Sequence, residues 1–201
     1  MIPEPLLAKI EAYKKAWKFK DALKVVNTVL TKNPSDKEAL FQVADIEYRQ
    51  GEIKRAEKPI DFLLQGAKED AMSHYVKGVL EMEKTQWVKA KEYFKTALQL
   101  MHEDNPEIMR CYGLCEYWSG NREDGIEYLR KALLANKLDA EIILNLIEVL
   151  ILEKERVEAR KYIDHYEKYK PKLQYFDRDL SYYDDKIRIF TDYVEEEGEK
   201  K

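Results

Sequence analysis

The sequence has little of what turns, disulfide frameworks and membrane spans require. Only seven glycines and six prolines occur in 201 residues, and no apolar stretch reaches the ~18 residues of a membrane helix. Ala, Leu, Lys and Glu are abundant instead, so the composition favours an all-helical protein. Two cysteines are too few for a disulfide framework and indicate a reducing compartment, which we expect to be the cytoplasm.

Charge and missing motifs exclude further classes of protein. A formal net charge of −4 argues against nonspecific nucleic-acid binding, which needs a basic surface. The opening "MIPEPLLAKIEAYKK" has no basic region before an apolar run, so we do not interpret it as a signal peptide. A phosphate-binding glycine loop, an H-E-x-x-H motif and a nucleophile elbow are all missing from the sequence. We therefore expect no catalytic residues, no enzyme activity and no cofactor.

Small residues recur at a regular spacing along the chain. Ala22, Ala56 and Ala90 are 34 residues apart, Gly125 follows after 35, and Ala159 after another 34. Such a period is typical of a repeat architecture. Two further columns keep the same register, one four residues after each small residue and one twelve residues before it: Val26, Ile60, Phe94, Leu129 and Ile163, and Ile10, Ala44, Gly78, Gly113 and Ile147.

This pattern resembles the tetratricopeptide repeat (TPR), a 34-residue helix pair with the pattern W-x2-L-G-x2-Y, then A-x3-F, then P. The resemblance implies an all-α solenoid of five antiparallel pairs in a right-handed superhelix, with a C-terminal helix and no strand. The small residues would lie where the first (A) and second (B) helix of a pair cross. The expected repeats cover about residues 3–36, 37–70, 71–105, 106–139 and 140–171, and residues 172–201 form a capping helix and charged tail.

Helix-capping residues support these boundaries. Each repeat from the second onward follows a residue whose short side chain can accept hydrogen bonds from free helix amides, namely Asp36, Asp70, Asn105 and Asp139. Gly51 and Gly120 stand where A helices should end.

Other positions depart from the repeat pattern. Trp17, Thr85 and Lys154 replace glycine at the end of the A helix, which predicts tighter or less regular turns. Pro59 falls inside the B helix of repeat two, where it should remove one hydrogen bond and bend the helix.

The stretch "RCYGLCEYWSG", residues 110–120, brings two cysteines together on the A helix of repeat four. Cys115 shares a column with Ala12, Ile46, Leu80 and Val149, so we interpret it as a small buried core residue. Cys111 lies one turn earlier, near the inner rim. A zinc site would need further ligands, and the histidines His74, His102 and His165 fall in three different columns. We expect no metal site, and a regulated thiol is the remaining alternative.

An acidic column is the second ordered feature. Glu47, Glu81 and Glu116 share a position where the family usually has tyrosine. One interpretation is an ion-pair ladder between repeats, with lysines and arginines of neighbouring helices. The other is a negative stripe that selects a basic partner.

The resemblance also implies that the A helices line a concave face that holds a ligand. The clamp by which chaperone adaptors of this family grip a terminal carboxylate is absent, because Leu7, Glu11, Asp45, Tyr75 and Val79 occupy its places. An apolar, aromatic middle remains, with acids towards both ends, and it would suit a partner segment with apolar anchors and some basic residues. The alternative is that the chain itself covers these side chains. The expected partner-binding groove comprises Phe41, Asp45, Tyr48, Arg49, Met72, Tyr75, Val79, Met82, Arg110, Leu114, Tyr117 and Trp118.

The tail carries a heptad stripe. Starting at Pro171, a helix of ~24 residues would align apolar side chains at spacings of three and four. It could cap the last repeat, mediate dimerisation or insert into the groove. The stripe is Leu173, Phe176, Leu180, Tyr183, Ile187, Phe190 and Val194.

Together these features predict a non-catalytic adaptor or scaffold that binds a peptide or helix of a partner protein. One alternative is a self-assembling structural protein, a homo-oligomer formed through repeat stacking or the C-terminal helix. A regulatory subunit of a larger complex is the other.

Overall fold

The computed structural model describes residues 1–101, 104–175 and 179–196. These residues form eleven α-helices and one short 3-10 helix, and no strand occurs among them. No described helix is long and apolar enough to cross a membrane. Three parts of the predictions lie outside the described residues: His102, Phe176 of the heptad stripe, and residues 197–201 of the charged tail.

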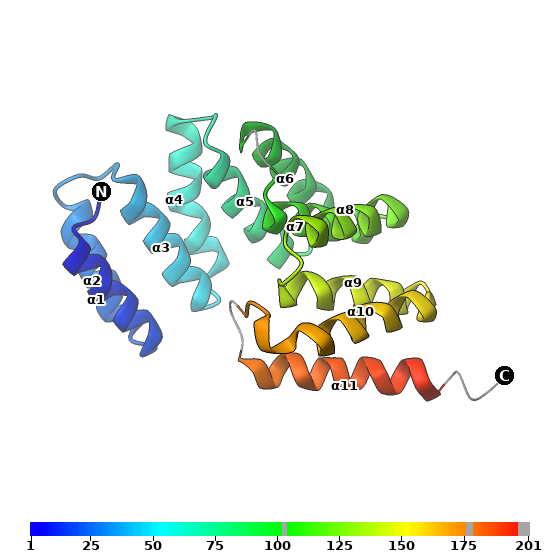
Figure 1. The fold of residues 1–201 in the computed structure, drawn as a ribbon. Helices are drawn as coiled ribbons and strands as arrows, with labels where there is room; N and C mark the ends of the chain where they lie inside the picture. The colour runs from blue at the N-terminus through cyan, green and yellow to red at the C-terminus, as the bar shows by residue number, and fades with distance from the viewer. Residues whose placement is uncertain (102–103, 176–178, 197–201) are drawn as a thin grey trace. The chain divides into compact units, whose positions relative to one another are not determined.

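Ten of the helices form five consecutive pairs, and each predicted repeat contains one pair (Figure 1). Three-residue turns join the two helices of a pair, as the helix bounds show. The pairs are α1 (Glu4–Lys15) with α2 (Phe19–Leu30), α3 (Lys37–Arg49) with α4 (Ile53–Gly66), α5 (Ala71–Glu83) with α6 (Trp87–Met101), α7 (Pro106–Trp118) with α8 (Arg122–Ala135), and α9 (Ala140–Leu152) with α10 (Arg156–Tyr169).

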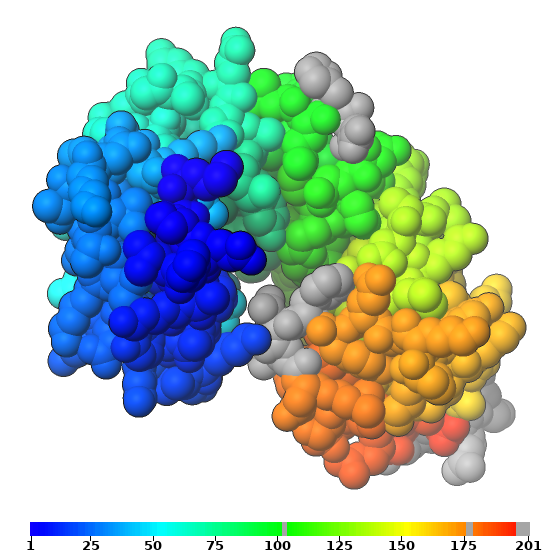
Figure 2. All heavy atoms as spheres, turned by 60° about the vertical axis from the view of Figure 1, so that its left-hand side comes forward, coloured from blue at the N-terminus to red at the C-terminus, as the bar shows by residue number. Residues whose placement is uncertain are grey.

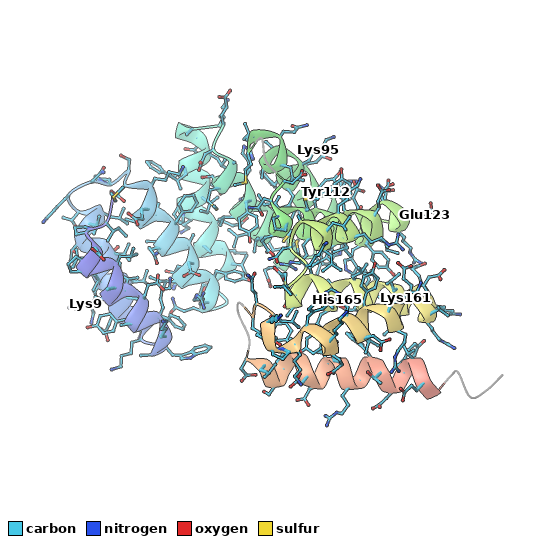
Figure 3. All side chains as sticks on the ribbon, viewed as in Figure 1. Lys9, Lys95, Tyr112, Glu123, Lys161 and His165 are labelled. Carbon is cyan, nitrogen blue, oxygen red and sulfur yellow. The ribbon has the colours of Figure 1, made fainter. Side chains whose placement is uncertain are left out.

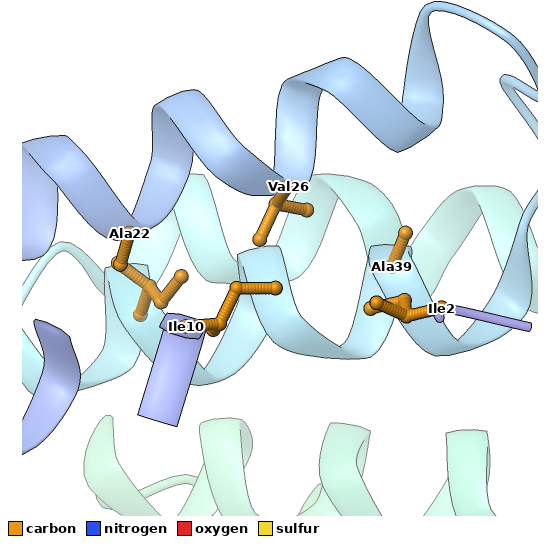
Figure 4. Close-up of a cluster of buried hydrophobic side chains, with 6 residues drawn as sticks. Ile2, Ile10, Ala22, Val26 and Ala39 are labelled. Carbon is orange, nitrogen blue, oxygen red and sulfur yellow. The ribbon is translucent and has the colours of Figure 1, made fainter. Parts of the chain in front are cut away.

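The chain divides into two compact units, an N-terminal unit of Met1–Leu100 and a C-terminal unit of Met101–Lys201. Figure 2 shows the surface of the N-terminal unit with α1 and α2 in blue. Charged side chains such as Lys9 on α1 and Lys95 on α6 are exposed (Figure 3). The first core cluster of this unit joins α1, α2 and α3 and contains Ile2, Ile10, Ala22, Val26, Ala39 and Ile46 (Figure 4).

The repeat register predicted from the small residues is confirmed by their burial. Ala22, Ala56, Ala90 and Ala159 have no exposed surface, and Gly125 is also buried. In the column four residues later, Val26, Ile60, Phe94 and Leu129 are fully buried and Ile163 is 2% exposed. The same columns are thus buried in all five pairs, as expected when each pair repeats one packing arrangement.

The helices of repeat four approach each other closely. A Cβ atom added at Gly125 would lie 2.6 Å from the backbone nitrogen of Tyr117 and 2.7 Å from the carbonyl oxygen of Gly113. A Cβ at Gly113 would lie 2.9 Å from the carbonyl oxygen of Gly125. Since these neighbours are backbone atoms that cannot swing aside, glycine is required at both positions.

All four predicted caps are confirmed. The side chain of Asp36 accepts a hydrogen bond from the amide of Ala39 at 3.0 Å, and that of Asn105 accepts one from Ile108 at 3.0 Å. Asp70 and Asp139 cap α5 and α9 in the same way. Each cap satisfies an amide that the first helical turn leaves without an internal partner.

The predicted irregular turns are wrong. Trp17, Thr85 and Lys154 have φ values of 57°, 56° and 64°, in the same left-handed region as Gly51 and Gly120. The amide after each of these five residues donates to a carbonyl five residues earlier, as in Gln86 N to Glu81 O at 2.9 Å. All five pairs therefore have the same turn conformation, which the helix-ending hydrogen bond stabilises. In three of them a residue with a side chain adopts positive φ, which is sterically strained.

Pro59 lies inside α4, and the helix continues to Gly66 beyond it. The proline ring has no amide to donate to the carbonyl of Arg55, so α4 lacks that bond. The Pro59 ring is buried. The predicted bend stays a prediction.

The C-terminal helix begins later than predicted. Pro171 lies in the 3-10 helix Lys170–Lys172, and the last helix, α11, is Leu180–Glu196, 17 residues long. Leu173 is extended. The amide of Gln174 donates to Leu138 O in the α8–α9 loop at 2.7 Å, and its carbonyl oxygen accepts from the amide of Ala140, the first residue of α9, at 3.2 Å. These bonds hold the backbone out of helical geometry.

Within the C-terminal unit α11 packs against α9 and α10. Tyr183 and Ile187 of the predicted stripe are 1% and 2% exposed, while Leu180 is 43% exposed. The hydroxyl of Tyr183 donates to Glu141 Oε2 at 3.0 Å, and that of Tyr166 donates to Asp184 at 3.0 Å. The helix thus covers the last pair, in the position of a capping helix.

Candidate functional site

An open pocket of about 410 Å³ lies between α3 and α5 in the N-terminal unit. Its walls are mostly apolar, because the A helices here present aromatic rings, valines and a methionine. Six of the predicted groove residues line it: Phe41, Asp45, Tyr48, Met72, Tyr75 and Val79. Two neighbouring A helices thus bring half of the predicted set to one hollow.

Sequence reasoning missed other wall residues. Gln42 and Val76 line the pocket and lie 34 residues apart, so they form one column of the repeat. That column is adjacent to the one containing Phe41 and Tyr75, and extending the predicted surface by one position would have found both. Ala44 and Leu80 also line the pocket, although the sequence assigned their columns to the core.

Charged and polar groups at the pocket bond to one another. Asp45 accepts from Lys14 Nζ at 2.5 Å and from Arg49 Nε at 2.9 Å. The hydroxyl of Tyr48 donates to Glu83 Oε1 at 2.7 Å. Arg49, predicted to line the groove, instead lies outside the pocket wall as a partner of Asp45, and Met82 is half-buried and also outside it.

In the C-terminal unit two of the predicted groove residues, Leu114 and Tyr117, are buried, and Arg110 is half-buried. Arg110 donates to both carboxylate oxygens of Glu107, at 2.8 and 2.6 Å, and to Asn145 Oδ1 at 2.8 Å. Leu114 is 9% exposed and Tyr117 is 4% exposed. Tyr117, predicted to line the groove, is therefore not available on the surface. Trp118 is 46% exposed.

A smaller pocket of about 240 Å³ borders these residues. Trp118, Leu152 and Arg122 contribute to its wall. The Tyr117 hydroxyl donates to Glu153 Oε1 at 2.7 Å, and Arg122 pairs with the same oxygen at 3.0 Å. Burial and the hydrogen bond to Glu153 raise the pKa of Tyr117 to about 12. Both favour the neutral phenol over the phenolate.

The two cysteines are free and buried, and the core role predicted for Cys115 is confirmed by its full burial. Cys111 is 2% exposed, with Sγ 3.4 Å from Glu107 Oε1. Burial, opposed by the Arg110 guanidinium, raises the pKa of the Cys111 thiol well above its ordinary value. A buried thiol of this kind is poorly reactive. Within the described part of the chain, no group of three or more His, Cys, Asp or Glu is placed to hold a metal ion.

The predicted glutamate column is largely buried in the structure and forms no exposed stripe. Glu81 and Glu116 are 6% and 7% exposed. Each glutamate pairs within its own repeat: Glu47 with Arg55 at 3.9 Å, Glu81 with Lys84 at 2.9 Å, and Glu116 with Tyr112 at 2.6 Å and Asn121 at 2.7 Å (Tyr112 is labelled in Figure 3). The column therefore forms no exposed stripe for a basic partner, and a link between repeats occurs at Glu81, because Lys84 also bonds to Glu57 of the preceding repeat at 2.7 Å.

Comparisons with known proteins agree with this geometry. A sequence profile of the tetratricopeptide repeat matches residues 7–71, which include α2, α3 and α4. No curated protein sequence matches the chain.

Solved structures share the fold at low sequence identity. PilF of Pseudomonas aeruginosa is 21% identical, with a TM-score of 0.71 over 82% of this chain and 75% of its own. A thermophilic TPR protein of Thermus thermophilus is 19% identical, with a TM-score of 0.73 over 95% and 98%. YrrB, described as a TPR protein with an unusual peptide-binding site, is 16% identical, with a TM-score of 0.60 over 84% and 87%.

The profile match, the shared fold and the five helix pairs in one register lead to the same conclusion. Residues 7–71 match the tetratricopeptide repeat, and the described residues have the all-α helix-pair fold of solved TPR solenoids.

Proposed function

We propose that this protein is a non-catalytic adaptor that binds a segment of a partner protein in the pocket between α3 and α5. The observation that carries the proposal is the pocket itself, about 410 Å³ and lined by aromatic and aliphatic side chains from two adjacent A helices. Anchoring sites for partner proteins are built in this way, from aromatic side chains around a hollow that excludes water.

Two features of the wall favour a protein segment as the occupant. The pocket is open rather than enclosed, so a side chain of a bound segment can enter it. Met72 is 43% exposed at its edge, and methionine adapts its shape to different ligands. YrrB, which has a similar fold, is described as having a peptide-binding site, and this likeness supports the same class of ligand here.

The proposal includes the surroundings in which binding would occur. An acidic chain with a net charge of −4 is poorly suited to nucleic acid, so the partner is a protein. Two free cysteines fit a reducing compartment, and we propose the cytoplasm.

A pair of valine substitutions tests the pocket. Val79→Lys places an ammonium group in the pocket wall, whereas Val88→Lys places the same group at a site on α6 that is already 63% exposed. Partners captured from a lysate of the native source by wild type and both variants would be quantified by mass spectrometry. We expect Val79→Lys to capture at least tenfold less of the specific partner than wild type does. Val88→Lys should capture as much as wild type.

Circular dichroism and the melting temperature of both variants serve as folding controls. Equal capture by a well-folded Val79→Lys protein would move the binding surface away from this pocket.

A further inference from the structure

The polar groups of the α3–α5 pocket are already paired within the protein. Asp45 is the one carboxylate among the described residues of the wall, and it bonds to Lys14 at 2.5 Å and to Arg49 at 2.9 Å. Gln42 accepts from Lys14 Nζ at 3.0 Å and donates to Glu11 at 3.4 Å. These side chains therefore have little capacity left for a ligand.

Glu83, a carboxylate outside the pocket wall, is also hydrogen-bonded within the protein. It accepts a hydrogen bond from the hydroxyl of Tyr48 at 2.7 Å, so both groups already have a partner. Tyr75 packs its ring against Phe94, with centroids 6.1 Å apart. Near the other edge, Lys37 pairs with Asp70 at 2.5 Å and lies 5.8 Å from the centre of the Phe41 ring.

A charged side chain entering this pocket would lose its water without gaining a partner. The rest of the wall is apolar, contributed by Met72, Val76, Val79 and Leu80. A buried charge without a counter-ion is costly. A lysine or arginine of the ligand would in addition lie near Lys14 and Arg49, which are already paired with Asp45. The like charges would repel one another.

We infer that the pocket accepts a bulky, uncharged apolar side chain, aromatic or aliphatic, and rejects a basic one. This inference rests on the proposed function, since it specifies the anchor residue that the partner segment inserts there. It departs from the sequence-based expectation of a partially basic partner, because Asp45 is bound to Lys14 and Arg49, and Glu83 is bound to the hydroxyl of Tyr48.

Capped single amino acids test this selectivity directly. Methyl groups of Met72, Val76, Val79 and Leu80 would be followed by two-dimensional NMR of the full chain during titration with N-acetyl-phenylalaninamide, N-acetyl-leucinamide or N-acetyl-lysinamide. The expected result is saturable shifts at these methyls with the first two compounds and none with the third. Equal shifts with the lysine compound, or no shifts with any compound, would overturn the inference.

Two variants convert the charge argument into a gain of binding, which misfolding cannot imitate. Lys14→Met together with Arg49→Gln releases Asp45 from both cations, and this protein should acquire binding of N-acetyl-lysinamide. Asp45→Asn leaves the two cations without this counter-ion instead, and it should acquire binding of N-acetyl-glutamate amide. Unchanged selectivity in both variants would contradict the role given to the paired charges.

The outcomes separate this inference from the proposed function. If Val79→Lys abolishes partner capture but the lysine compound binds the wild-type pocket as well as the phenylalanine compound, the proposed function stands and the anchor chemistry is wrong. If the compounds bind as expected but Val79→Lys captures every partner, the pocket is selective and the partner binds elsewhere.

Discussion

The A helices of the two units use equivalent positions in opposite ways. In the N-terminal unit Tyr48 is half-buried and borders an open pocket of about 410 Å³. In the C-terminal unit the same column contains Tyr117, which is 4% exposed and bonded to Glu153. A column of the repeat therefore fixes where a side chain begins but not whether it is available to a partner.

The difference arises from the neighbours on the next A helix. Arg110 is long enough to reach Asn145 on α9 while holding Glu107 on its own helix, so polar bonds close the space between α7 and α9. Phe41 in the N-terminal unit forms no such bridge, and the space between α3 and α5 stays open. The two faces therefore differ at the column of Phe41 and Arg110, since Tyr48 on the open face does reach Glu83 of the next repeat at 2.7 Å.

The largest expected effect is on the two equivalent tyrosines. Tyr117→Ala should lower the free energy of unfolding by about 3–4 kcal/mol, because it empties a buried site. Tyr48→Ala should cost only about 1 kcal/mol, since its ring is half-exposed and loses less burial. Urea unfolding followed by circular dichroism measures both, and equal costs would remove the distinction between an open and a closed face.

Close helix packing in repeat four predicts the next effect. Gly125→Ala should destabilise the protein by about 2–3 kcal/mol, because the added Cβ meets backbone atoms at 2.6 and 2.7 Å. Gly66→Ala is the matched control, since nothing lies within 4 Å of its Cβ position, and it should stay within about 1 kcal/mol of wild type. The equivalent crossing residue of repeat two is Ala56, which already accommodates a methyl group. A Gly125→Ala protein as stable as wild type would mean that α7 and α8 are no closer than α3 and α4.

Alkaline pH should weaken the closed face through Tyr117. Its pKa is raised from 10.0 to about 12 in the folded protein, so the neutral phenol stabilises the fold below pH 10. This contribution is lost as pH rises from 10 towards 12, because the unfolded chain releases the proton first. The stability difference between wild type and Tyr117→Phe should therefore shift in favour of Phe across that interval. Unfolding at several pH values measures it, and a constant difference would show that the phenol titrates normally.

The smallest effect concerns a feature that the two units share. Thr85→Gly and Lys154→Gly should each stabilise the protein by about 0.5 kcal/mol, because glycine adopts positive φ without steric cost but is more flexible when unfolded. Thr96→Gly, inside α6, is the opposite control and should destabilise the protein by a similar amount. Melting temperatures resolve the three variants. A loss of stability in Thr85→Gly would indicate that the threonine makes contacts worth more than its strain.

The repeat register could be predicted from sequence because five copies of one environment demand the same residue types. Ala22, Ala56 and Ala90 show this: each crossing position excludes a larger side chain, and the constraint recurs every 34 residues. The caps were predictable for a similar reason, since an unpaired amide needs an acceptor at one fixed place. Local, repeated requirements leave a pattern in the sequence.

Other features depend on contacts that do not recur. Trp17, Thr85 and Lys154 adopt the glycine conformation because the helix-ending hydrogen bond outweighs their strain, which residue type alone does not reveal. The late start of α11 depends on the pairing of Gln174 with the α8–α9 loop. Half of the predicted groove residues line the α3–α5 pocket, whereas predicting that Arg110 bonds within the protein required knowledge of its partner Asn145.

The backbone pairing of Gln174, which we call the Gln174 joint, has a consequence for engineering the protein. Its two main-chain bonds to Leu138 and Ala140 involve only backbone atoms. Such bonds do not depend on which side chains follow, so the joint would form equally well ahead of a different terminal helix. A foreign helix that keeps tyrosine and isoleucine at the positions of Tyr183 and Ile187 could be grafted after this residue. The other faces of the last helix could then display a chosen tag, enzyme or second binding module without alteration of the five repeats.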